Sequence, residues 1–128
     1  MIVLDASALV AFSKPSDQHH EAAVQEFGAN LGNLAISSLT LAEFLVHPAQ
    51  ADRAASTYED LTSPGGLAIQ VIDAPLVNGR PWPVHLAHVR AETRLKMPDA
   101  VVLATALAVG GKVLTYDATL ARAAKTLG

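Results

Sequence analysis

Four short aliphatic runs, separated by longer segments of helical character, are the feature that most limits how this chain can fold. Such runs are most simply buried strands, because they are apolar throughout rather than alternating. Strands that alternate with helices are typical of a parallel sheet with helices on both faces. The sequence therefore predicts a three-layer α/β/α sandwich with a mostly parallel sheet of four or five strands. The expected strands are residues 2–4, 34–36, 67–72 and 112–115.

Helices are predicted from apolar spacing and from the residues that start and stop helices. Ser37 or Ser38 can cap the helix after the second strand, and Pro48 is expected to end it. The loop around Pro81 is the best candidate for a flexible flap. The expected helices are 6–12, 19–30, 39–46, 49–61, 84–95, 99–109 and 118–127.

The length and composition indicate one compact domain, residues 1–128. The chain is 51% hydrophobic, which argues against disorder and leaves apolar surface for a homodimer or partner interface. It has no cysteine, so disulfides and thiolate metal sites are excluded. The net charge of −3 argues against a protein that coats duplexes more than against an enzyme that contacts nucleic acid locally.

The N-terminal segment does not have the pattern of a secretory signal. It begins Met1-Ile2-Val3-Leu4-Asp5, with no basic region before the apolar residues. No apolar stretch reaches the roughly 18 residues that a membrane span requires. We expect a soluble cytoplasmic protein without membrane association.

Four acidic residues adjoin the apolar segments, and no Lys or Arg is next to any of them: Asp5, Glu43, Asp99 and Asp117. An unpaired charge beside buried segments costs on the order of several kcal/mol. A shared divalent cation would remove that cost, because hard metals favour oxygen ligands. This pattern predicts a metal site.

The predicted topology can bring the four acids to one edge of the sheet, where ligands of open parallel sheets bind. Asp5 and Asp117 follow strands, and Asp99 opens a helix, whose dipole favours an anion. Glu43 lies on the helix after the second strand. Clustered carboxylates raise one another's pKa, which one or two Mg²⁺ or Mn²⁺ ions would resolve. Two such ions about 3.5–4 Å apart suit phosphodiester hydrolysis.

Each acid also has a simpler interpretation. Asp5 and Asp99 could cap the helices that follow them, and Asp117 could be an ordinary turn residue. Glu43 is harder to explain in this way, because it interrupts an apolar helix. Asp73 also ends a strand, and we interpret it as a turn residue outside the site.

Four sequence blocks resemble the conserved blocks of PIN-domain ribonucleases. They are IVLDASAL at 2–9, SLTLAE at 38–43, MPDA at 97–100 with ATA at 104–106, and VLTYD at 113–117. The length and block order resemble the VapC-type toxins of type II toxin–antitoxin systems, over nearly the whole chain.

The resemblance implies Mg²⁺-dependent endonucleolytic cleavage of RNA by a metal-activated water, with Mn²⁺ as the other candidate ion. It also implies inhibition by a cognate VapB-type antitoxin, and homodimer formation. It assigns Asp5, Glu43, Asp99 and Asp117 to the catalytic metal site, with Thr115 and Ser7 in support.

Two positions depart from the family pattern. The family commonly has Asn before the last acid, whereas this chain has Tyr116, which could alter the hydrogen bonds around Asp117. Many relatives continue into a short edge strand where this chain stops at Gly128, so the sheet is expected to have four or five strands.

Basic residues near the third block have two interpretations. Arg90, Arg94 and Lys96 are either a solvated helix face or a basic rim that holds RNA phosphates, with Arg80 as a further candidate. Trp82 could stack on a base, although packing against the core or a second protomer is favoured.

The histidines do not form a zinc motif. His47 follows Glu43 by one helical turn and could reach the site, although a structural role at a helix end is favoured. Surface roles are expected for the other histidines: His19, His20, His85 and His88.

Three other functions remain as alternatives. A haloacid dehalogenase phosphatase needs a second Asp at the position of Ser7. A response-regulator receiver needs an acidic pair near the start, although Asp73 could imitate its phosphoacceptor. A catalytically silent PIN-like scaffold is the third alternative, and the four intact acids argue against it.

Overall fold

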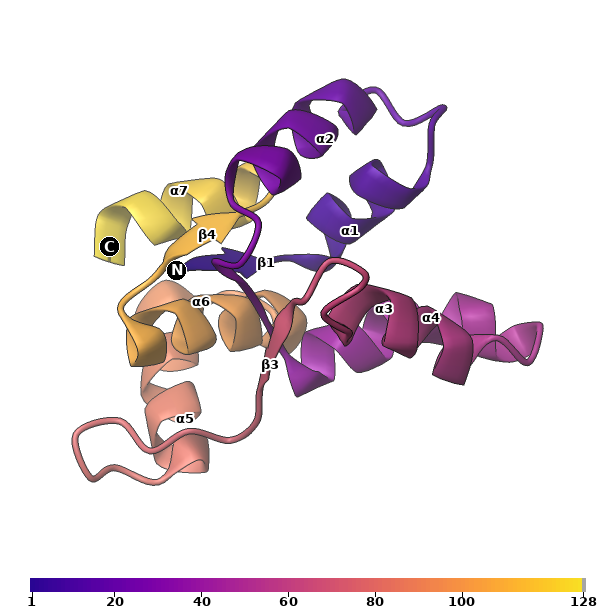
Figure 1. Cartoon of the computed structure of the whole chain (residues 1–128). Helices are drawn as coiled ribbons and strands as arrows, with labels where there is room; N and C mark the ends of the chain where they lie inside the picture. Colours follow the sequence, from indigo (N-terminus) through magenta and orange to yellow (C-terminus); the bar gives the residue numbers. More distant parts are fainter. Residues whose placement is uncertain (128) are drawn as a thin grey trace.

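The computed structural model describes residues 1–127 and has a sheet of four parallel strands in that range (Figure 1). The strand order is β3-β2-β1-β4, and Val3 of β1 is in register with Ala35 of β2 and Val113 of β4. The predicted parallel α/β architecture is confirmed. The expectation attached to the chain end at Gly128 lies outside the described residues. The strands are β1 Ile2–Leu4, β2 Leu34–Ser37, β3 Gln70–Ile72 and β4 Lys112–Leu114.

Helices connect the strands and cover both faces of the sheet (Figure 1). None of the helices within residues 1–127 has the length and apolar character needed to cross a membrane. The helices are α1 Ala6–Ser13, α2 His20–Ala29, α3 Ser38–Gln50, α4 Ala54–Thr62, α5 Trp82–Thr93, α6 Met97–Val109 and α7 Ala118–Leu127.

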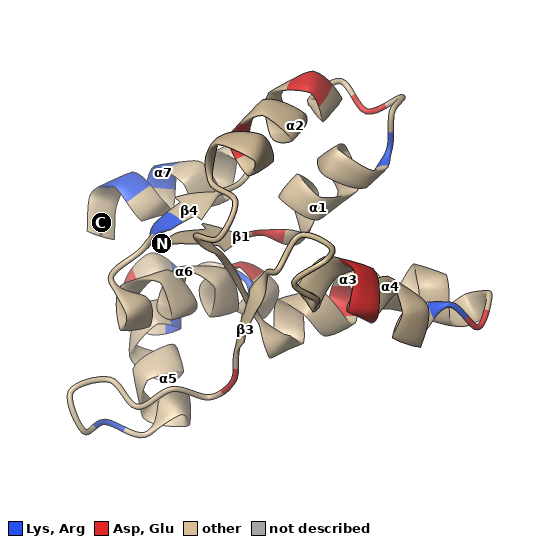
Figure 2. Ribbon diagram, viewed as in Figure 1, with Lys and Arg blue, Asp and Glu red and all other residues tan. Residues whose placement is uncertain are grey.

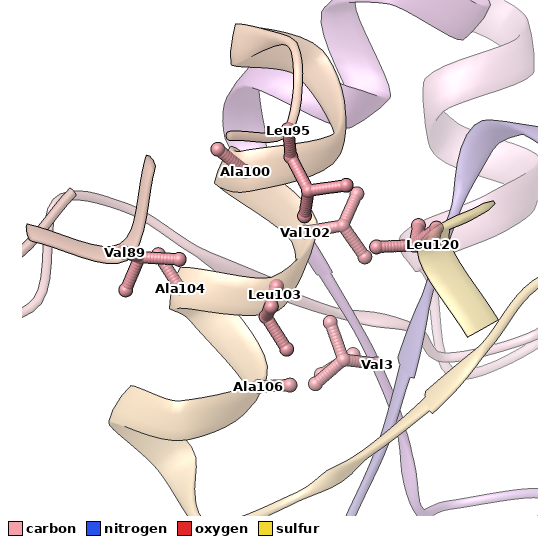
Figure 3. Packing of buried hydrophobic residues seen from close by; sticks show 10 residues of the cluster. Val3, Val89, Leu95, Ala100, Val102, Leu103, Ala104, Ala106 and Leu120 are labelled. Atoms are coloured by element: carbon pink, nitrogen blue, oxygen red, sulfur yellow. The ribbon is translucent and has the colours of Figure 1, made fainter. Parts of the chain in front are cut away.

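Two hydrophobic cores lie on opposite faces of the sheet, because successive strand residues point to opposite sides. Val3 belongs to the core under α5, α6 and α7, where Figure 3 shows it beside Leu103 and Ala106 of α6. The next residue, Leu4, belongs to the core under α1 to α4, together with Phe27. This two-sided burial explains why the two central strands, β1 and β2, are almost entirely apolar.

The region around Pro48 differs from the prediction. Helix α3 begins as expected, with the Ser37 hydroxyl accepting a 3.2 Å hydrogen bond from the backbone N–H of Leu39. It does not end before Pro48 but continues to Gln50, and α4 begins only at Ala54. A proline removes one helical hydrogen bond, which a helix near its end tolerates. The Pro48 carbonyl then accepts from the N–H groups of Ala51 and Arg53 and forms the turn between α3 and α4.

The sheet order places the carboxyl ends of β1 and β4 side by side. Leu4 is in register with Leu114, so the residues that follow both strands leave the sheet together. Helix α1 starts after β1, and α7 starts after β4. The first and last of the four predicted acids therefore emerge at the same edge.

Candidate functional site

Asp5 is held by two hydroxyl groups at the carboxyl end of β1. Its Oδ2 accepts hydrogen bonds from Ser7 Oγ and from Thr115 Oγ1, both at 2.7 Å. Asp5 occupies the N-cap position of α1, but its side chain makes no capping hydrogen bond. The residue is 8% exposed, so the carboxylate is a buried anion that the two hydroxyls orient. The simple capping interpretation of this side chain is therefore wrong.

The same two hydroxyls tie the segment after β4 to the start of α1. Ser7 Oγ accepts from the backbone N–H of Tyr116 at 3.0 Å, and Thr115 Oγ1 accepts from the backbone N–H of Asp117 at 3.0 Å. The two hydroxyl oxygens lie 3.3 Å apart. Each hydroxyl thus accepts from the backbone and donates to Asp5, which fixes the carboxylate relative to both strands.

The four predicted acids come together around the first turn of α6. Partial burial raises the pKa of Asp99 above its usual value, and the charges of Asp117, Asp5 and Glu43 raise it further, in that order. The charge of Lys96 acts in the opposite direction. Three acids from three other elements therefore lie close enough to Asp99 to act on it. Figure 2 shows acidic segments directly after β1, on α3 and on α6.

The acids differ in exposure more than their sequence context suggests. Only Asp5 is buried; Asp99 is half-buried, and Glu43 and Asp117 are exposed. Asp117 Oδ1 also accepts from the backbone N–H of Leu120 at 2.9 Å. The acid thus stabilises the first turn of α7, a role that was not predicted from the sequence. Burial and the repulsion between neighbouring carboxylates both contribute to the electrostatic cost at Asp99, and burial is the largest single cause.

Asp73 remains outside the cluster. It follows the edge strand β3, and its Oδ1 accepts a 2.8 Å hydrogen bond from the hydroxyl of Ser38. Its charge is not among those that shift the pKa of Asp99. This hydrogen bond to the start of α3 gives Asp73 a local structural role outside the acidic cluster.

The basic residues fall into two groups. Arg90 and Arg94 line an open groove of about 430 Å³ on α5 together with Met97, and the charge of Lys96 acts on Asp99. Lys96 is therefore near Asp99, and Met97 connects the groove to a small pocket that Glu43 also lines. Arg80 instead lies in the loop between β3 and α5, where its backbone pairs with Val77, and Figure 2 shows this loop at the periphery of the molecule.

One histidine is buried, contrary to the predicted surface role. His85 is 6% exposed, and its Nε2 lies 2.9 Å from the carbonyl oxygen of Ala104. Its ring centroid is 5.7 Å from that of Trp82, which packs against the core under α6. His85 joins α5 to α6, and Trp82 has the packing role that was favoured.

An aromatic stack beside the site was missed by sequence reasoning. The rings of His19 and Tyr116 lie 4.6 Å apart with an interplanar angle of 6°. Burial, followed by the charges of Glu26 and Asp17, raises the pKa of the Tyr116 hydroxyl. No spacing in the sequence indicates this contact, because α2 and β4 meet only in the folded chain. The stack anchors α2 to the segment that carries Thr115.

The donor chemistry of the cluster fits a divalent cation. All four side chains are carboxylates, which are ligands that Mg²⁺ and Mn²⁺ accept. Asp5 makes both of its side-chain hydrogen bonds through Oδ2, and within residues 1–127 its Oδ1 accepts none. In that same range, no three or more acidic or histidine side chains are already arranged as a metal-binding group. The four carboxylates therefore lie near one another, but they are not arranged around a single ion position.

Comparison with known proteins identifies the family. The family model described as PIN domain matches residues 2–126. No curated protein sequence matches the chain significantly. Among solved structures, a toxin–antitoxin complex from Klebsiella pneumoniae is 22% identical with a TM-score of 0.71, covering 91% of this chain and 87% of that one.

Two further structures have the same fold. VapC20 from Mycobacterium tuberculosis, a toxin that cleaves the sarcin–ricin loop, is 14% identical with a TM-score of 0.71 and covers 96% of this chain and 95% of that one. FitAcB from Neisseria gonorrhoeae is 22% identical with a TM-score of 0.70 and covers 98% and 94%. At these identities the likeness concerns the fold alone.

Proposed function

The chain belongs to the PIN domain family, and from that premise we propose that it is a VapC-type toxin. In this proposal it is a Mg²⁺-dependent endoribonuclease that a cognate antitoxin inhibits. The observation that carries the proposal is the convergence of Asp117, Asp5 and Glu43 on Asp99. An acidic cluster at the carboxyl edge of a parallel sheet is unfavourable without a counterion, and a hydrolytic metal site explains why it exists.

Asp5, Glu43, Asp99 and Asp117 would hold the divalent ion. When bound, such an ion lowers the pKa of a water molecule and neutralises charge on the leaving oxygen. The hydroxyls of Ser7 and Thr115 act on Asp5: by donating to Oδ2 they fix the carboxylate and leave Oδ1 for the ion. They are positioning residues in this mechanism.

The substrate contacts are assigned to Arg90, Arg94 and Lys96. Arg90 and Arg94 line one groove, and Lys96 lies close enough to lower the pKa of Asp99. Cations in this place would hold RNA phosphates beside the hydrolytic centre. Arg80 has the weakest support, because its loop lies at the periphery (Figure 2).

The antitoxin and the homodimer are also proposals. The Klebsiella structure is a toxin–antitoxin complex, and VapC20 is a toxin that cleaves the sarcin–ricin loop. These relatives support an antitoxin partner and an RNA substrate. Exposed apolar side chains on α3 and α6, among them Leu39, Val46 and Met97, provide surface that a second protomer could cover.

Purified protein, incubated with RNA in Mg²⁺ or in chelator, tests the proposal. Cleavage is expected only with the metal, and Asp5→Asn and Asp99→Asn are expected to abolish it while the fold survives. Asp73→Asn is the matched control, because Asp73 ends a strand but lies outside the cluster. Full cleavage by either site variant would contradict the metal mechanism. A folded parent that binds RNA but never cleaves it would favour the silent PIN-like scaffold.

A further inference from the structure

Three hollows on the surface share lining residues and follow one another past Glu43, one of the four acids. The α5 groove, lined by Arg90 and Arg94, shares Met97 with a small pocket of about 210 Å³. That pocket shares Glu43 with a larger cleft of about 820 Å³. Glu43 therefore lies between the larger cleft and the small pocket that adjoins the α5 groove.

The larger hollow, which we call the α1–α3 cleft, is lined by both helices and by the turn after α3. Its apolar wall includes Val10 of α1 and Phe44 of α3. Its rim carries two exposed cations, Lys14 from the α1–α2 connection and Arg53 from the α3–α4 turn. Figure 2 shows basic colour on both connections, beyond the acidic segments. At about 820 Å³ it falls within the range of roughly 300–1,000 Å³ typical of ligand pockets.

From this arrangement we propose that the α1–α3 cleft is a second substrate subsite, which binds RNA on the far side of the acidic cluster from Arg90 and Arg94. Lys14 and Arg53 bind phosphates there, and the apolar wall receives a nucleobase. The inference rests on the proposed ribonuclease function and adds its substrate geometry: a single strand that crosses the acids and is held by cations on both sides.

The distribution of charge favours RNA over a protein segment in this cleft. A polyanion that reaches the acids must be held against their repulsion, and cations on both flanks provide that hold. An unpaired base has a flat apolar face that can lie on side chains such as Val10 and Phe44, while its phosphate stays at the rim. A duplex would keep its bases stacked inside and would leave the apolar wall empty.

Binding can be separated from cleavage by measuring both. Fluorescence anisotropy of a labelled single-stranded RNA, with the Asp99→Asn chain to prevent cleavage, gives the affinity and its salt dependence. Lys14→Ala and Arg53→Ala should each weaken binding by about three- to ten-fold. Each should also reduce the slope of log affinity against log salt by about 0.7, the value for one lost phosphate contact to a single strand. When Asp99 is retained and RNA cleavage is measured, the same two substitutions should raise KM more than they lower kcat.

Two exposed cations on α7 provide matched controls. Arg122→Ala and Lys125→Ala remove the same charges from a helix that does not line the three hollows, so affinity and salt slope should stay at the parent values. Val10→Glu is an independent variant, because it places an acid in the cleft without removing a cation. Val10 is 41% exposed, so the fold should tolerate the change while RNA binding falls.

The outcomes distinguish this inference from the function on which it rests. Cleavage by the parent, with Lys14→Ala and Arg53→Ala indistinguishable from the α7 controls, would overturn the subsite and leave the ribonuclease intact. A parent that never cleaves RNA would overturn the proposed function, while the anisotropy series would still report on the cleft. Unchanged RNA binding together with lost inhibition by the cognate antitoxin would assign the cleft to a protein segment instead.

Discussion

Thr115 donates its hydroxyl to Oδ2 of Asp5 at 2.7 Å, although the two residues lie 110 positions apart in the chain. Oγ1 of Thr115 also accepts a hydrogen bond from the backbone N–H of Asp117. One threonine side chain thus links the first acid of the chain to the segment that carries the last. The Thr115 hydroxyl therefore contributes both to the stability of the fold and to the orientation of Asp5, and substitutions of Thr115 can test both effects.

Thr115→Val removes both hydrogen bonds while nearly preserving side-chain shape. Loss of a hydrogen bond to a carboxylate is expected to cost about 1–3 kcal/mol of unfolding free energy. RNA cleavage should fall as well, because Asp5 loses one of the two donors that orient it. Urea denaturation and initial cleavage rates provide the measurements. Thr115→Ser, which retains the hydroxyl, should stay closer to the parent in both; equal losses in the two variants would contradict the assigned role.

The raised pKa of Asp99 predicts a pH dependence of stability in metal-free buffer. Between the usual value of 3.8 and the higher folded pKa, the folded state binds more protons than the unfolded state. The free energy of unfolding therefore falls as the pH rises through that window. The Asp99→Asn variant has no ionisable group at this position and does not lose free energy of unfolding in this way. Its stability relative to the parent should therefore increase as the pH is raised from about 4 toward neutrality. Parallel denaturant titrations measure the difference, and a pH-independent difference would count against the repulsion.

Magnesium should stabilise the parent protein more than the Asp99→Asn variant. An ion that binds only the folded state adds about 1.4 kcal/mol at ten times its dissociation constant. It would also relieve the repulsion that raises the pKa of Asp99. Thermal melts with and without Mg²⁺ report this shift independently of activity. Asp73→Asn should respond like the parent, and a parent melt that Mg²⁺ does not move would argue against a metal site.

Tyr116 offers two informative substitutions. Its hydroxyl is buried and has no protein hydrogen-bond partner within residues 1–127. Tyr116→Phe should therefore leave the free energy of unfolding unchanged or raise it by about 1 kcal/mol. Tyr116→Asn loses the stack on His19 and should destabilise by about 2 kcal/mol, since large-to-small changes at packed positions cost this much or more. Chemical denaturation measures both, and a more stable Asn variant would show that the stack contributes little.

Substitution by alanine is expected to have opposite effects on stability at two glycines, Gly66 and Gly28. A Cβ on Gly66 would lie 1.9 Å from the backbone oxygen of Asp60, so Gly66→Ala should destabilise by about 1–3 kcal/mol. Gly28 lies in helix α2 with nothing within 4 Å of the added carbon. Gly28→Ala should therefore stabilise by about 0.5–1 kcal/mol. Melting temperatures of the two variants should move in opposite directions.

The sheet was predictable because its central strands, β1 and β2, are buried on both faces and its outer strands still carry two consecutive aliphatic residues each. Prediction failed where local chain geometry, not hydrophobicity, decides the structure. Residues 67–69 are as apolar as a strand, yet the N–H groups of Leu67 and Ile69 donate back to carbonyls at the end of α4, and β3 begins only at Gln70. Ala68 between them has a φ of 50°. A pattern of apolar residues does not indicate that the backbone will turn back and hydrogen-bond to the preceding helix.

The gathering of the four acids was predictable from the sequence, whereas their exposure and local hydrogen bonds were not. The position of Asp5 and Asp117 after neighbouring strands is enough to bring them to one edge. Sequence neighbours did not reveal that Glu43 is exposed or that Asp117 also caps α7. The contact between His19 and Tyr116 could not be foreseen either, because it depends on how α2 packs over the end of β4.

The pairing of the first strand with the last has a consequence for protein synthesis. A ribosome delivers Asp5 and Ser7 together, but it delivers Thr115, the second hydroxyl donor to Asp5, 110 residues after Asp5. A nascent or prematurely terminated chain lacks both the donor and the fourth acid. The acidic centre can therefore be assembled only after Thr115 and Asp117 have been synthesised.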